Sequence, residues 1–415
     1  MHVTYAQQDI TPVVPCPMDG YGRREATGVH DNITVRCVLI SDGEGQLLRQ
    51  LCLCVADVFF LEPSLAKEAR QAIASRTGLP KDAVHVAAIH THSGPKVSKL
   101  ADPGCPPDPS FIEALLDAMA SSVERCMAQW DGQGNATARL GTCDLSGLFT
   151  NRNGADAGCD TTGTVLSFTS ADGSQRIDIL HVACHPTVLH GENHLLSTDY
   201  VGALREKYES LTGSHAIVLV GDAGDSSTRF TRRGEGFDEV ERIGGEIARR
   251  FAAATLQTAS IALGGTREVP VHLDYVSAED ETLLSAKRML AGLLKDPAAA
   301  KASGIAARED DLRQMLGMVE AKLAIPQICL DATATLVDLG CVRLALVPSE
   351  VVFSFGEQLR DASPVPVLVC GYFDGYLGYA VDRSEYGRFF ESYITVFPKG
   401  AADEWFSRMA AALLS

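Results

Sequence analysis

Residues 84–95 have the sequence VHVAAIHTHSGP, and this stretch decides how the rest of the chain is interpreted. Its first six residues are apolar except for His85, a pattern that predicts a short buried strand. The run ends in two histidines, His90 and His92, and a Ser-Gly-Pro turn follows them. Because successive side chains of a strand point to opposite faces, both imidazoles are expected on one face. Open α/β sheets bind ligands at the carboxyl ends of their strands, so the pair favours a metal or catalytic site over two hydrogen-bonded core histidines.

Apolar, β-branched runs alternate with helical patterns along most of the chain. The expected strands cover residues 34–40, 51–55, 84–89, 136–140, 165–168, 176–183, 216–220, 332–339, 342–347 and 365–370. The expected helices cover residues 63–76, 109–130, 199–211, 237–256, 352–361 and 401–415, and a turn is expected at residues 42–45. This order predicts an α/β fold, a layered mixed β-sheet with flanking helices.

Residues 278–324 interrupt the alternation with two long helical patterns around Pro297 and Gly304. They predict a helical hairpin inserted between strands. The hairpin is either a lid or partner surface, or a packed element with no direct role. The sequence contains no internal repeat and no low-complexity linker, so residues 1–415 are expected to form a single domain.

The composition argues against several classes of protein. The 53 acidic and 36 basic residues give a net charge of −17, which disfavours nucleic acid and anionic membrane surfaces as partners. No apolar run reaches the roughly 18–20 residues of a membrane span, and the N-terminus has no secretory signal pattern. Twelve scattered cysteines without a C-x-x-C motif are typical of a reduced protein, so a cytoplasmic location is expected. Homo-oligomer formation is compatible with this composition.

A second group of histidines lies between residues 181 and 194, where four of the eleven occur. His185 is one of them, and Glu350 comes shortly after another expected strand. Imidazoles and a carboxylate suit Zn²⁺, which binds both ligand types at about 2.0–2.2 Å. Pooled with His90 and His92, these residues favour a zinc site. Ligands on separate strands leave no local signature, so spacing alone does not identify the ligand set.

Several short motifs, taken together, resemble the neutral (neutral/alkaline non-lysosomal) ceramidase family. They are His90-Thr91-His92-Ser93-Gly94-Pro95, Asn151-Arg152, His185-Pro186, Ser197 with Asp199, Gly224 to Ser227, Pro348-Ser349-Glu350, Tyr376 with Tyr379, and Glu385-Tyr386. The motifs occur in the family's order across most of the chain. The resemblance implies a zinc-dependent amidase, in a family that cleaves the amide between a fatty acid and sphingosine. It also implies one ceramidase-like catalytic domain over residues 1–415.

The resemblance implies four zinc ligands, His90, His185, Glu350 and Tyr379. The Glu350 carboxylate and a Tyr379 phenolate together balance the 2+ charge of the ion. A free tyrosine has a pKa of about 10 and is neutral at pH 7, but a bound cation favours the phenolate form. Four protein ligands usually indicate a closed structural zinc, so catalysis requires a fifth position for water.

Other residues are assigned to the reaction by the same resemblance. His92 is the active-site histidine beside the metal, which suits proton transfer to the leaving nitrogen. Arg152 faces the substrate carbonyl, where a guanidinium stabilises the developing oxyanion. Ser227 is the active-site serine, with a helix N-cap as the alternative. Tyr376 and Arg229 are expected to contact the substrate together with Arg152.

The chain departs from the full-length secreted ceramidases in two respects. They have an additional C-terminal β-sandwich-like domain and an export signal, and neither is expected here. A further tyrosine of the family falls near Phe390-Glu391 in this sequence, and Tyr393 is the nearest substitute.

These departures bear on the substrate. An acidic chain without export favours a small soluble N-acyl compound over membrane ceramide. The arginines of the motif loops, Arg23, Arg24, Arg152 and Arg229, favour a substrate that carries a carboxylate. Two alternatives stay open: an esterase or lactonase on the same zinc site, and a non-catalytic paralogue that uses the pocket only for binding.

Overall fold

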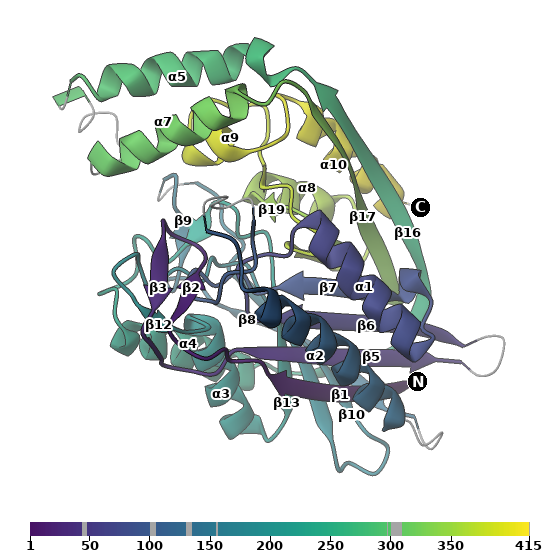
Figure 1. Ribbon diagram of the computed structural model, residues 1–415. Coiled ribbons are helices and arrows are strands. Elements are labelled where there is room, and N and C mark those ends of the chain that lie inside the picture. The colour runs from purple at the N-terminus through teal and green to yellow at the C-terminus, as the bar shows by residue number, and fades with distance from the viewer. Residues whose placement is uncertain are drawn as a thin grey trace.

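The computed structural model describes residues 1–43, 48–99, 105–129, 135–154, 157–296, 298–299 and 309–414. Its helices and sheets form layers (Figure 1). The first sheet has the order β1-β5-β6-β7, antiparallel except for the parallel β6–β7 pair. Its strands and the two helices on its outer face are β1 (His2–Asp9), β5 (Thr34–Asp42), β6 (Arg49–Ala56), β7 (Val84–Ala88), α1 (Pro63–Thr77) and α2 (Pro109–Ala128).

The second sheet packs against the inner face of the first. Residues such as Val38 and Leu53 of one sheet share a core with Leu166 and Ile179 of the other. Its order is β13-β11-β10-β8-β15, and helices α3 and α4 pack on it. The elements are β8 (Thr137–Asp144), β10 (Thr162–Thr169), β11 (Arg176–Val182), β13 (His215–Val220), β15 (Gln257–Ala259), α3 (Tyr200–Thr212) and α4 (Phe237–Ala252).

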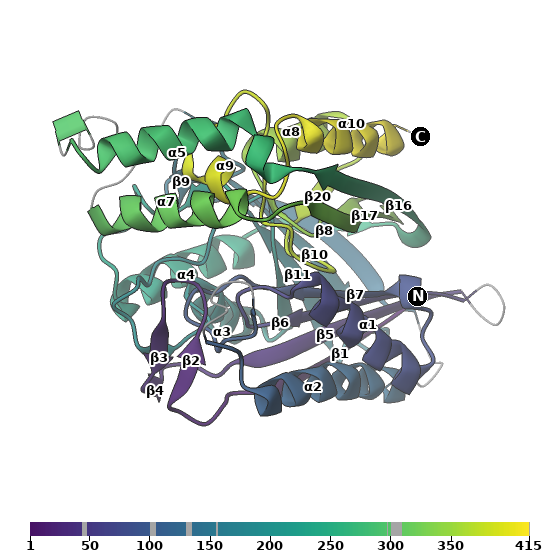
Figure 2. The same ribbon diagram turned by 45° about the horizontal axis from the view of Figure 1, so that its top comes forward.

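The third sheet, β16-β17-β18-β20, lies under the C-terminal helices α8 and α10 (Figure 2). Its elements are β16 (Ile261–Tyr275), β17 (Ile328–Gly340), β18 (Arg343–Leu346), β20 (Val367–Cys370), α8 (Phe353–Asp361) and α10 (Ala401–Leu413). Short two-stranded pairs join the loops. They are β2 (Cys16–Met18) with β3 (Arg24–Ala26), β4 (Gly28–Val29) with β12 (Leu195–Leu196), β9 (Thr150–Asn151) with β14 (Ser226–Ser227), and β19 (Glu350–Val351) with β21 (Tyr379–Ala380).

The predicted hairpin consists of α5 (Glu281–Leu293) and α7 (Glu309–Leu323), and it packs on the short helix α9 (Phe390–Ile394) (Figure 1). The shared apolar core comprises Leu283, Ala286, Leu290, Leu312, Met315, Val319 and Tyr393. Pro297 and Gly304, which the sequence places at the hairpin turn, lie outside the described residues.

Most of the predicted elements agree with the structure to within a few residues, and the predicted α/β class is confirmed. Strand β7 is buried along its whole length but ends at Ala88, before His90. Helix α2 ends at Ala128, and Trp130 lies outside the described residues, as do positions 44 and 45 of the predicted turn. Among the described helices, none has the length and apolarity to span a membrane.

Candidate metal centre

His90 enters the centre through a bend in the backbone directly after β7. The amides of Ile89 and His90 donate to the carbonyls of Ala56 and Val58, and His90 itself has the left-handed φ of 67°. The predicted reason for the convergence of His90 and His92, alternation along a strand, is therefore wrong. Non-glycine residues rarely adopt this conformation, and such strain is often found at functional sites.

The ring of His90 is oriented by a backbone carbonyl. Its Nδ1 lies 2.8 Å from the carbonyl oxygen of Phe59, which can only accept a hydrogen bond. The proton therefore resides on Nδ1, and the lone pair of Nε2 faces the cluster. This is the arrangement of metal-binding histidines, whose second nitrogen commonly donates to a carbonyl or carboxylate.

His185, which follows β11 in the second sheet, is held in the same way. Its amide donates to the Ser226 carbonyl at 3.0 Å, and its Nδ1 donates to the Ala223 carbonyl at 3.0 Å. Burial lowers the pKa of His185 to about 3, so its imidazole is neutral at pH 7 and its Nε2 is also a free lone pair.

Three histidines meet at one point. Potential ligand atoms of His90, His92 and His185 all lie within 4.8 Å of one another. Nε2 of His90, Nε2 of His185 and both ring nitrogens of His92 are buried, and none has a hydrogen-bond partner in the described part of the chain. Burial, followed by the neighbouring histidines, lowers the pKa of His92 well below its usual range. Each unsatisfied buried group costs about 1–3 kcal/mol, so this cluster fits a metal ion.

Glu350 adds a carboxylate to the cluster. Its Oε2 lies 3.4 Å from Nε2 of His90 and 3.5 Å from Nε2 of His185. The hydroxyl of Tyr372 donates to Oε2 at 3.3 Å, and the hydroxyl of Tyr376 donates to Oε1. The Tyr372 ring also stacks on His90, with 4.2 Å between centroids. Tyr372 orients two side chains of the centre, and sequence reasoning missed it.

Tyr379 is brought beside Glu350 by the backbone. The two are register partners in the parallel β19–β21 pair, and the Glu350 amide donates to the Gly378 carbonyl at 2.9 Å. The hydroxyl of Tyr379 accepts a hydrogen bond from Nη2 of Arg152 at 3.0 Å. Burial raises the pKa of Tyr379 well above its usual value, so a nearby cation is required to make it a phenolate.

Arg152 has a second partner that the sequence analysis did not assign. Its Nε lies 2.7 Å from Oε1 of the buried Glu391, and the side-chain amide of Asn153 donates to the other Glu391 oxygen at 3.1 Å. Tyr393, the expected substitute for the family's further tyrosine, instead donates its hydroxyl to the Gly387 carbonyl. A single glutamate has no spacing pattern, so only the fold reveals this pair.

The other predicted site residues have different surroundings. Ser227 is buried in β14 opposite Thr150, and its hydroxyl accepts from the Arg229 amide at 3.2 Å. The helix N-cap alternative for Ser227 is wrong, because the next helix begins at Phe237. Arg229 is exposed, and its guanidinium lies over the Phe230 ring. The substrate contacts assigned to Tyr376 and Arg229 stay predictions.

Comparison with known proteins identifies the fold. No protein-family model matches the sequence, and no curated protein matches it. Among solved structures, neutral ceramidase from Pseudomonas aeruginosa matches with a TM-score of 0.74 at 20% identity. A ceramidase complexed with C2 matches with a TM-score of 0.73 at 18% identity. Each match covers 99% of this chain and 74% of the other. The chain has the neutral ceramidase fold.

Within this neutral ceramidase fold, His92 is enclosed by the segment that connects β2 to β3. Gly20 has a φ of 105°, and a Cβ there would lie 2.4 Å from Cα of His92. The ring of Tyr21 lies 4.9 Å from the imidazole of His92. Arg24 is buried, and its Nη2 donates to the carbonyls of His92 and Asp19. Arg24 was expected to be a loop arginine available for an anion, and its contact with His92 has no signature in the sequence.

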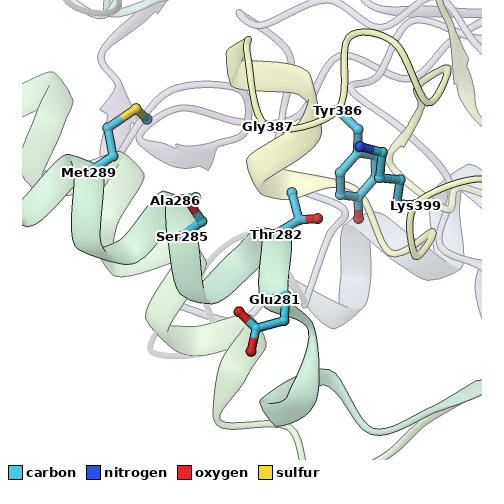
Figure 3. A pocket seen from close by; sticks show the side chains of 8 residues that line it. All are labelled: Glu281, Thr282, Ser285, Ala286, Met289, Tyr386, Gly387 and Lys399. Carbon is cyan, nitrogen blue, oxygen red and sulfur yellow. The ribbon is translucent and has the colours of Figure 1, made fainter.

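A separate hollow in the neutral ceramidase fold lies between α5 and the segment that contains Tyr386 and Lys399 (Figure 3). Its volume is about 290 Å³. The lining residues are Glu281, Thr282, Ser285, Ala286, Met289, Tyr386, Gly387 and Lys399. No predicted site residue lines it.

Proposed function

We propose that this protein is a zinc-dependent hydrolase that cleaves the C–N amide bond of an N-acyl compound. The observation that carries the proposal is the convergence of His90, His92 and His185 on one buried point beside Glu350. The shared fold supports it, since the two solved structures compared above are both described as ceramidases.

The proposed ligands are His90, His185, Glu350 and Tyr379. The two histidines present free Nε2 lone pairs, and the carboxylate oxygen lies 3.4 and 3.5 Å from them. When bound, zinc polarises the amide carbonyl and lowers the pKa of a water molecule towards about 7.

The remaining residues of the site bind and transfer protons in this proposal. Arg152 donates to the carbonyl oxygen of the amide and stabilises the negative charge that develops there. His92, whose two ring nitrogens have no other partner in the described chain, accepts a proton from the attacking water and passes it to the leaving nitrogen. Ser227, Tyr376 and Arg229 complete the proposed substrate contacts.

We further propose that residues 1–415 act as a single ceramidase-like catalytic domain on a small N-acyl compound rather than on membrane ceramide. The net charge of −17 supports this preference, because an acidic surface is repelled by anionic membranes. A higher kcat/KM for long-chain ceramide than for any short-chain soluble amide would contradict it.

The central test combines elemental analysis with a substrate panel of N-acyl amides and esters that share the same acyl chains. We expect one zinc per chain and amide hydrolysis, with both lost in His90→Ala. A zinc protein that cleaves only the esters is an esterase or lactonase. A protein without metal and without turnover is a binding paralogue.

A further inference from the structure

Glu391 places a buried negative charge directly on the arginine proposed to contact the substrate carbonyl. Its Oε1 lies 2.7 Å from Nε of Arg152, and its Oε2 accepts from Asn153 at 3.1 Å. The Glu391 side chain is 2% exposed, against 15% for Arg152. Such a charge-assisted pair, shielded from water, neutralises the guanidinium far more effectively than a surface ion pair does.

The nitrogens of Arg152 divide into committed and free donors. Nε binds Glu391, and Nη2 donates to the Tyr379 hydroxyl at 3.0 Å. Within the described residues, Nη1 makes no hydrogen bond. Nη1 and its two N–H groups therefore remain for a substrate oxygen, while the positive charge of the guanidinium is already matched by the Glu391 carboxylate.

The position of Glu391 is fixed by its helix. The neighbouring residue Phe390 packs edge-on against the Tyr379 ring, with centroids 6.2 Å apart. On its other side, α9 contributes Tyr393 to the apolar core of the α5–α7 hairpin. The hairpin thus supports the helix that carries Glu391, so the carboxylate cannot readily move away when a substrate arrives.

A substrate carboxylate beside Arg152 would meet Glu391 as a like charge in a region that excludes water. The buried guanidinium of Arg24 offers no replacement, since it donates to the backbone carbonyls of Asp19, His92 and Asn193. Two of the four arginines that favoured an anionic substrate are therefore committed to other partners.

We propose that Glu391 is a specificity-determining positioning residue, which acts through Arg152 to select N-acyl amides without a charge next to the scissile bond and to reject N-acyl amino acids. The inference rests on the proposed amide hydrolysis, and it replaces the expected carboxylate-bearing substrate with an uncharged one.

Two matched substrates test this proposal, N-octanoylglycine and N-octanoylglycinamide, which differ only in a carboxylate against a carboxamide. Octanoate release is measured at pH 8 for the zinc-loaded wild type and Glu391→Gln. We expect the wild type to prefer the glycinamide at least tenfold in kcat/KM. Glu391→Gln should reduce that preference at least tenfold, mainly through a lower KM for the acylglycine.

Two further variants separate charge from shape. Glu391→Asp keeps the charge and should retain a preference for the glycinamide. Glu385→Gln removes a nearby carboxyl that forms no hydrogen bond or ion pair with Arg152, and it should leave the preference unchanged. Burial raises the pKa of Glu385 to about 7, so its carboxyl is mostly ionised at pH 8. A wild-type preference for the acylglycine, or equal preferences in wild type and Glu391→Gln, would overturn the proposal.

A binding measurement distinguishes this inference from the proposed function. If the wild type cleaves neither compound nor other amides, the hydrolase proposal fails, and equilibrium dialysis with labelled N-octanoylglycine still tests Glu391. At least tenfold tighter binding to Glu391→Gln than to the wild type supports the charge selection. Equal binding to the two proteins overturns it. Thermal melting verifies that each variant is folded.

Discussion

At the scale of single residues, His92 differs from its two neighbours in how its ring is held. His90 and His185 each donate from Nδ1 to a backbone carbonyl, whereas the ring nitrogens of His92 have no partner in the described chain. Its ring is instead enclosed by Tyr21 and Phe59, at centroid distances of 4.9 and 4.6 Å. A histidine held by packing keeps both nitrogens available for proton transfer.

This difference predicts opposite effects on metal content. His92→Ala should keep its zinc and lose about 10²–10⁴-fold in kcat, the usual contribution of a general acid or base. His90→Ala should lose zinc together with activity. Elemental analysis and steady-state kinetics on the same preparations check both outcomes. Loss of zinc from His92→Ala would make His92 a ligand.

Gly20 provides a second prediction, because its backbone lies against His92. A methyl group there would lie 2.4 Å from Cα of His92, and the φ of 105° is unfavourable for alanine. Gly20→Ala should shift His92, reduce kcat by roughly 10²-fold and destabilise the fold by about 1–3 kcal/mol. Gly22→Ala is the matched control, since a Cβ at Gly22 meets no atom within 4 Å. Similar kinetics for the two variants would contradict the prediction.

The residues of the centre were predictable from sequence to different degrees. His90, His92, His185 and Glu350 belong to motifs or follow apolar runs, and the structure brings them together. Their geometry was not predictable, because it depends on a left-handed residue after β7 and on contacts between distant segments. Glu391 was missed because its partner is 239 positions away, beyond any local pattern.

At the scale of elements, the helices were easier to predict than the third sheet. The hairpin helices have clear periodicity, but no pattern indicates that they pack on α9. Strand β16 was missed because it contains Gly264, Gly265 and Pro270, residues that usually end strands. Strand β16 lies at the edge of the third sheet. Pro270 is tolerated there because an edge strand can lack one backbone N–H donor without breaking the sheet.

Lys322 gives the hairpin a measurable pH dependence. Its side chain is buried, and its ammonium has no hydrogen-bond partner in the described residues. Burial lowers its pKa from 10.5 to about 8. Between these two values the unfolded chain binds more protons than the folded chain, so the free energy of unfolding should rise with pH from about 8 to 10.5.

Lys322→Met should remove this rise and stabilise the protein at pH 7 by about 2 kcal/mol. Denaturant unfolding at pH 7, 9 and 10.5 measures both effects. The control is Lys287→Met on α5, an exposed lysine 3.0 Å from Glu320, which should change stability by less than about 0.5 kcal/mol. A destabilised Lys322→Met with an unchanged pH profile would refute the prediction.

At the scale of the whole molecule, the centre joins all three sheets. His90 follows β7 of the first sheet, His185 follows β11 of the second, and Glu350 follows β18 of the third. The sequence predicted the layers because the strands and helices alternate. It did not predict which sheets pack face to face, since a buried strand has a similar apolar pattern in any of them.

A metal held between three sheets should stabilise the entire fold. A ligand that binds only the folded state raises the free energy of unfolding. The increase is about 4 kcal/mol when the free ligand concentration is a thousand times its Kd. Chelation should therefore lower the Tm by roughly 5 °C or more, and added zinc should restore it. Calorimetry with and without a chelator measures the shift, and His90→Ala should be insensitive to both reagents. An identical Tm with and without the chelator would contradict a zinc that binds all three sheets.

The wide separation of the proposed ligands has a consequence for biosynthesis. The ribosome makes His90 well before Tyr379, and β19 pairs with β21 only after both strands have emerged. A nascent chain that still lacks Tyr379 therefore cannot hold the ion with the full proposed ligand set. The first two sheets are therefore expected to pack before the ligand set is complete, and the proposed zinc would add its full contribution to stability only after Tyr379 has joined the centre.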